Sequence, residues 1–200
     1  MIIGHLWGLI VHPEREWKLI RKESHGFCRI FLGRILWLPA IPAVSTWYGT
    51  TQVGWRISDK ADAVRLSTDS ALWMAVLGWL AISLGIVLMG GFIQWMSKTY
   101  GTRATYSESL AFSCYAAYPL LLSGLAGVWP AIWVLMLVAL TGIAMAVWLL
   151  FSGLPYFMEI PEERAFIYAS SVLCVGLVMV VALMMLTVVL WGAGMGPVYR

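Results

Sequence analysis

The stretch that decides the fold is WMAVLGWLAISLGIVLMGGFIQW, residues 73–95, which holds no charged side chain and has a tryptophan at each end. At 1.5 Å per residue, a helix of this length measures about 33 Å, close to the bilayer hydrocarbon core of about 30 Å. Tryptophan is enriched where that core meets the headgroups. The stretch therefore predicts a helix that crosses a membrane.

Four more apolar runs accompany it, so the chain holds five, at residues 30–47, 72–96, 110–128, 131–151 and 166–191. Backbone N–H and C=O groups find no partners in lipid, and spans of this length must therefore be helical. Hydrophobic residues make up 61% of the chain and charged residues 12%, whereas a soluble domain has about a quarter charged. The sequence predicts an all-α polytopic membrane protein, a bundle of five transmembrane helices.

The segment before the first run, residues 5–23, has the pattern of an amphipathic helix. Pro13 suits a first helical position, and Trp17 and Ile20 form an apolar ridge beside a basic face. A helix of this composition lies at the headgroup boundary, where basic side chains attract anionic lipids. A solvated basic connector is the alternative. The candidate headgroup-binding residues are Arg15, Lys18, Arg21 and Lys22.

This pattern divides the chain into a cytoplasmic amphipathic segment, residues 1–25, and a five-helix transmembrane domain, residues 26–200. With the N-terminus inside, nine basic residues lie on the inner side and four on the outer side. The inner ones are Arg15, Lys18, Arg21, Lys22, Arg29, Arg34, Lys98, Arg103 and Arg164, and the outer ones are Arg56, Lys60, Arg65 and Arg200. Because Lys and Arg favour the cytoplasmic side, this imbalance predicts a cytoplasmic N-terminus and a periplasmic C-terminus.

The first and third runs carry the features that a transport path would use. Pro39 and Pro42 interrupt the first run, and interrupted helices mark binding sites in transporters. The third run is the most polar, and Tyr115, Tyr118 and Ser123 are candidates to line a cavity. The other interpretation is that these hydroxyl groups are satisfied at a proline kink of their own helix. A small permease or channel acting as an oligomer, with spans one and three lining the path, is therefore an alternative function.

Two local patterns give packing expectations. Ala81 and Gly85 form a small-xxx-small pair, which predicts that another helix approaches the second run closely there. Glu108 is the acidic residue nearest to the mouth of the third run, and a role at the start of that helix explains it better than proton transfer.

Chemistry-bearing motifs are missing from the sequence. No Walker A, nucleophile-elbow, H-E-x-x-H or dinucleotide pattern occurs. Cys28, Cys114 and Cys174 are widely spaced and are interpreted as small apolar residues, while His12 and Glu16 share a helix face but make only two metal ligands. We therefore expect no enzymatic activity, no metal and no cofactor. A basic soluble face with stacking aromatics is also missing, which excludes nucleic acid as a partner.

The loop before the fifth run holds four charged residues of interest, Glu159, Glu162, Glu163 and Arg164. We expect them to form either a structural clamp or a partner-docking surface. In the clamp, Arg164 turns inward and pairs with a carboxylate or with carbonyl groups freed at Pro119 or Pro155, since a guanidinium offers five donors in a fixed fork. A solvated arginine at a helix start is the alternative.

Several motifs keep a characteristic order along nearly the whole chain. They are His12-Pro13, Trp17 and Glu23, then Pro39 and Pro42, then Tyr118-Pro119-Leu120 with Gly124, and finally Gly153-Leu154-Pro155, Met158, Pro161-Glu162-Glu163-Arg164-Ala165 and Tyr168. In this order the chain resembles the bacterial branch of the Yip1 family of small membrane proteins. The resemblance implies five helices and a cytoplasmic N-terminus. The Asp-Leu-Tyr-Gly-Pro signature of eukaryotic members is missing, so a Rab-binding role is not implied.

These features together predict a non-enzymatic integral protein of a bacterial inner membrane. We expect it to bind lipid or a protein partner and to take part in membrane organisation. The expected partners are membrane lipids, another membrane protein or further copies of the same chain.

Overall fold

A computed structural model describes residues 8–9, 12–22, 33, 35–55 and 63–199, and the structural statements below concern these residues. Its longer helices are α2 (Pro13–Lys22), α4 (Ala40–Tyr48), α5 (Thr68–Ser97), α6 (Tyr106–Ser123), α7 (Ile132–Met158) and α8 (Glu162–Leu190). Short π- or 3₁₀-helical segments follow α4, α6 and α8, namely η2 (Gly49–Val53), η3 (Gly124–Val128) and η4 (Trp191–Met195). The described part of the chain contains isolated β-bridges but no strand. The predicted all-α fold is confirmed.

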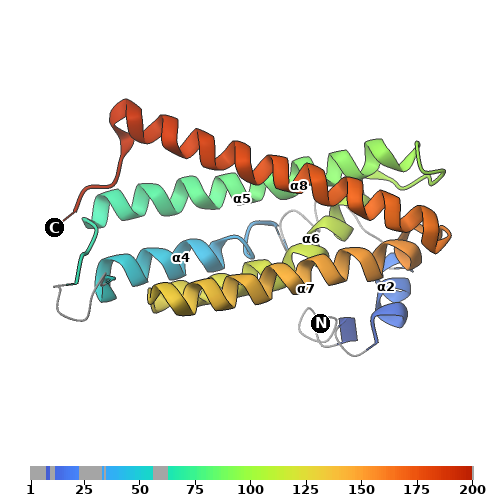
Figure 1. Cartoon of the computed structure of the whole chain (residues 1–200), viewed down its shortest axis with the longest axis horizontal. Coiled ribbons are helices and arrows are strands. Elements are labelled where there is room, and N and C mark those ends of the chain that lie inside the picture. Colours follow the sequence, from blue (N-terminus) through green and yellow to red (C-terminus); the bar gives the residue numbers. More distant parts are fainter. Residues whose placement is uncertain (1–7, 10–11, 23–32, 34, 56–62, 200) are drawn as a thin grey trace.

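Helices α4 to α8 lie along the long axis of the molecule, and α2 lies at one end of them (Figure 1). Consecutive helices from α5 to α8 run in opposite directions, so the last turns of α5 and α7 and the first turns of α6 and α8 meet at the same end as α2. We call this end the α2 end. The residues that follow α8 lie at the opposite end, where Leu66 and Tyr199 form a β-bridge.

Four helical stretches are long and apolar enough to cross a membrane: Thr68–Ser97, Tyr106–Val128, Ile132–Met158 and Glu162–Met195. They confirm the second to fifth predicted spans. The first predicted span, residues 30–47, lies partly outside the described residues. Its described part is interrupted, because a turn at residues 36–39 precedes α4. Pro39 is the N-cap of α4 and Pro42 falls in its first turn, where a missing N–H is tolerated.

Among the residues that the structure describes, charged side chains are confined to the two ends of the molecule. Within the described stretches 35–55, 70–97, 109–158 and 165–199, no Asp, Glu, Lys or Arg occurs. Four exposed tryptophans mark the end opposite α2, namely Trp73, Trp129, Trp133 and Trp191. An uncharged belt with tryptophans at its rim is typical of a protein that crosses a bilayer.

Helix α6 is the central helix of the bundle and the most buried of the four spans. Its polar side chains bond to α5: the Tyr106 hydroxyl donates to the Val87 carbonyl at 3.1 Å, and the Ser113 hydroxyl donates to the Ile86 carbonyl at 3.3 Å. The helix begins with a capping box between Thr105 and Glu108, which confirms the helix-start role expected for Glu108. The most polar span is thus the one that lipid touches least.

The close approach of α6 to α5 occurs at Gly90, where an added Cβ would lie 3.0 Å from the Cα of Leu110. The prediction of a close contact at Ala81 and Gly85 is wrong, because a Cβ on Gly85 would meet no atom within 4 Å. Both glycines suit a helix contact by size. Only Gly90 faces α6, and the sequence of an evenly apolar helix does not distinguish its two sides.

Candidate functional site

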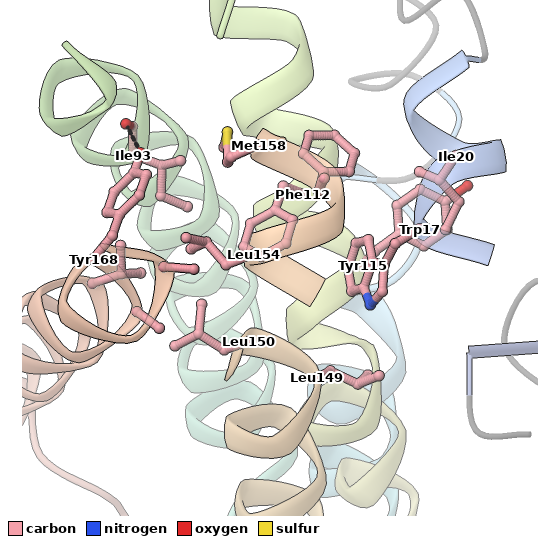
Figure 2. Close-up of a cluster of buried hydrophobic side chains, with 14 of the residues drawn as sticks. Trp17, Ile20, Ile93, Phe112, Tyr115, Leu149, Leu150, Leu154, Met158 and Tyr168 are labelled. Carbon is pink, nitrogen blue, oxygen red and sulfur yellow. Dashed lines mark hydrogen bonds between the residues drawn. The ribbon is translucent and has the colours of Figure 1, made fainter. Parts of the chain in front are cut away.

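The apolar ridge of α2 is inserted into the bundle. Trp17 and Ile20 are fully buried, and the Trp17 ring lies 4.9 Å from the Phe112 ring of α6 and 5.8 Å from the Phe157 ring of α7, measured between centroids. Figure 2 shows both α2 side chains pointing toward Phe112 and Tyr115. The sequence placed this ridge at the lipid surface. That prediction is wrong for Trp17 and Ile20, which contact protein instead.

A glycine in α7 makes the room for this insertion. A Cβ on Gly153 would overlap the indole ring of Trp17, so the ring fits only beside a residue without a side chain. Sequence reasoning used Gly153 as a family motif and did not identify its partner. An isolated glycine inside a long apolar helix is a usable signal for such a contact, since it costs helix stability and needs a packing reason.

Arg21 fixes α2 to the C-terminal end of α7. Its guanidinium donates a hydrogen bond to the Phe157 carbonyl, and its Nε lies 3.4 Å from a carboxylate oxygen of Glu159. The last carbonyl groups of a helix lack partners within the helix and carry partial negative charge, which favours a cation there. Glu159 itself has a left-handed backbone, with φ of 53°. Arg21 is therefore engaged within the protein and is not free for a lipid headgroup.

The other three basic residues of α2 remain exposed. Arg15, Lys18 and Lys22 are spaced by three and four residues, so they share one face of the helix. The Lys18 ammonium lies 5.3 Å from the centroid of the Tyr156 ring of α7, a cation–π distance. We call these three residues the basic stripe. Of the four candidates from the sequence, the structure thus places three on one accessible face and one in a protein contact.

The charged loop before α8 differs from the expected clamp. Arg164 is exposed, and its guanidinium lies 3.7 Å from the position that a Cβ on Gly101 would take, in the loop between α5 and α6. Of these two arginines, Arg21 and not Arg164 turns inward at this rim, because α2 brings it to the end of α7. Glu162 and Glu163 are exposed at the start of α8. A docking role for the loop stays a prediction.

Two of the three candidate cavity residues lie in contact within the core, and the third lines a separate groove. Tyr115 and Tyr118 are fully buried, with ring centroids 5.1 Å apart, and belong to the same core cluster as Trp17. Ser123 lines an apolar groove of about 450 Å³ between α6 and α7, and its hydroxyl donates to the Leu120 carbonyl at 2.7 Å. In the described part of the chain these three residues therefore do not form the polar path that a permease would need.

Comparison with known proteins agrees with this architecture. The family model of the Yip1 domain matches residues 7–183, a region that begins before α2 and ends within α8. The chain belongs to the Yip1 family. The chain is also similar to the inner membrane protein YohC of Escherichia coli K12, with 35% identity over 192 residues, covering 96% of this chain and 98% of the relative.

The inner membrane protein YohC of Escherichia coli O6:H1 matches with the same identity and coverage. No solved structure matches the chain. The similarity to these inner membrane proteins and the four apolar spans together indicate that the chain is an integral inner-membrane protein. The matched region includes Trp17, Arg21 and Gly153, the residues that join α2 to α7.

Proposed function

We propose that the chain is a non-enzymatic membrane protein whose basic stripe binds the headgroups of anionic lipids. One observation carries the proposal: Trp17 and Arg21 hold α2 against the bundle, while Arg15, Lys18 and Lys22 stay exposed. A fixed helix presents its charges in one direction at little further entropic cost, as a preorganised binding surface does.

The depth of α2 favours headgroups as the ligand. The 27 residues of α7 extend over about 40 Å, which exceeds the hydrocarbon core of about 30 Å by roughly 5 Å at each end. This overhang covers about the last three or four residues of α7, so Tyr156 and Phe157, which Lys18 and Trp17 of α2 contact, fall at the headgroup level. Each exposed basic residue near an anionic surface contributes about 1 kcal/mol, so the stripe provides about 3 kcal/mol.

The distribution of charge supports a cytoplasmic α2 end. Of the eight Lys and Arg among the described residues, seven lie at the α2 end and only Arg65 lies at the other. Positive charge favours the cytoplasmic side, so the proposal places α2 inside and the C-terminus in the periplasm. The anionic lipids of the cytoplasmic leaflet would then be the ligands.

The proposal can be tested with the full-length protein in nanodiscs of phosphatidylcholine and phosphatidylglycerol. Electron paramagnetic resonance of spin-labelled phosphatidylglycerol measures how much of this lipid the protein immobilises. The triple variant Arg15→Gln/Lys18→Gln/Lys22→Gln should immobilise less phosphatidylglycerol than the wild type at low salt, and the difference should shrink as salt screens the charges.

The matched control removes three other exposed charges at the same end, with Lys98→Gln/Arg103→Gln/Arg164→Gln. It should have a smaller effect than the α2 variant. Equal losses in the two variants would show a general electrostatic attraction without a site on α2. No loss in the α2 variant would reject lipid binding by the stripe and would leave a protein partner as its ligand.

A further inference from the structure

A second groove lies between α4 and α5, at the opposite end of the bundle from α2. Its volume is about 520 Å³, within the range of small-molecule sites, and all residues that line it are apolar. The groove runs between two neighbouring helices that lie side by side along the long axis (Figure 1). We call it the α4–α5 groove.

The groove exists because small side chains lie between large ones along both helices. Three tryptophans, Trp37, Trp47 and Trp79, line it together with Ala40, Ala43 and Ala75. Where two helices present alanines to each other between much larger side chains, a hollow remains. The indole N–H of Trp79 donates to the Leu36 carbonyl at 2.9 Å and so holds this ring in place at the start of α4.

The position and direction of the groove match those of a lipid chain. Its α5 side, residues 72–79, covers about 10 Å along the helix, and one leaflet of the hydrocarbon core is about 15 Å thick. The groove begins near the level of Trp73, one of the four tryptophans at the membrane rim, and no charged residue lines it. Helices that cross a bilayer run roughly along its normal, as acyl chains do. Trp37, at the open side, is 72% exposed.

We propose that the α4–α5 groove binds one acyl chain of a phospholipid from the leaflet opposite α2. An elongated apolar groove, open along the side that faces the membrane, takes a flexible chain better than it takes the single side chain of another protein. The site is independent of the basic stripe, since it lies at the other end of the bundle and recognises the tail of the lipid, not its charge.

The test uses full-length protein in phosphatidylcholine nanodiscs that contain a trace of phosphatidylcholine with a photoactivatable diazirine on one acyl chain. The zwitterionic headgroup keeps the labelling independent of the basic stripe. After illumination, mass spectrometry of peptides should find adducts at residues 36–47 and 72–79 severalfold above those on the exposed α7 face at residues 132–140. Even labelling of all lipid-exposed faces would overturn the proposal.

Groove-filling variants provide the second measurement. Ala43→Phe on α4 and Ala75→Phe on α5 should each reduce adducts in the groove severalfold and leave the labelling of α7 unchanged, which also reports that the bundle is folded. Gly85→Phe, where a Cβ meets no atom within 4 Å, adds the same ring outside the groove and should change nothing. Unchanged groove labelling in both filled variants would reject the site.

Discussion

The indole ring of Trp17 occupies the space that a side chain at position 153 would fill, so α2 packs against α7 at a residue that has no side chain. The two residues are far apart in the sequence, and Trp17 is completely buried between Gly153 and the rings of Phe112 and Phe157. Through this contact the amphipathic N-terminal helix becomes part of the transmembrane bundle. The contact between Trp17 and Gly153 also fixes the direction in which α2 presents its basic stripe.

Gly153→Ala should destabilise the protein, because the new Cβ overlaps the Trp17 ring and forces α2 away. Overpacking of this kind costs about 1–3 kcal/mol of unfolding free energy. Unfolding in mixed detergent micelles measures it, with Gly85→Ala as the control at an open position on α5. In the double variant Gly153→Ala/Trp17→Ala the added cost of the alanine should disappear, since the two residues share one contact. A Gly153→Ala protein as stable as Gly85→Ala would contradict the packing.

Arg21→Gln should lower the unfolding free energy by about 1–3 kcal/mol, because it leaves the Phe157 carbonyl and the Glu159 carboxylate without their donor. Arg164→Gln is the matched control, since it removes the same group from an exposed position and should stay within about 0.5 kcal/mol of wild type. If Arg164→Gln lowered the unfolding free energy as much as Arg21→Gln, the loss would not be specific to the contact of Arg21 with the end of α7. The assignment of a stabilising role to Arg21 alone would then fail.

Glu159→Gly should be more stable than Glu159→Ala by about 1–2 kcal/mol, because residue 159 has φ of 53° and only glycine adopts this conformation without strain. Both variants lose the ion pair with Arg21, so their difference isolates the backbone effect. The side chain of Glu159 is 71% exposed and that of Arg21 is 30% exposed, and such a pair contributes at most about 1 kcal/mol. Equal stability of the two variants would show that the turn relaxes when the side chain changes.

The proposed orientation makes a labelling prediction. In a background without Cys28, Cys114 and Cys174, a cysteine at Lys18 should react with a membrane-impermeant reagent only from the cytoplasmic side, and one at Val198 only from the periplasmic side. Both positions are exposed, so accessibility to the reagent depends on the side of the membrane. Labelling of the Lys18→Cys protein in intact cells with a permeabilised outer membrane would show that the topology is the reverse of the proposed one.

Some features of the fold were predictable from local sequence. The spans around residues 73–95, 110–128, 131–151 and 166–191 appear as α5 to α8, since transfer of apolar residues into lipid depends on composition and length alone. Pro13 at the start of α2 and Glu108 in the capping box of α6 follow from interactions within a single turn. Even the buried ridge of α2, Trp17 and Ile20, was visible as an apolar stripe.

By itself, then, the sequence determined that the chain is an all-α membrane protein, where its long helices lie and which end is basic. Only the tertiary structure decided that Trp17 packs against Gly153 and not lipid, that Arg21 and not Arg164 turns inward, and that Gly90 and not Gly85 touches α6. The physical reason is the solvent. The buried face of a helix in water can be predicted from the contrast between its apolar and polar sides. A helix in lipid is apolar on every side, so its contacts depend on where small residues let another helix approach.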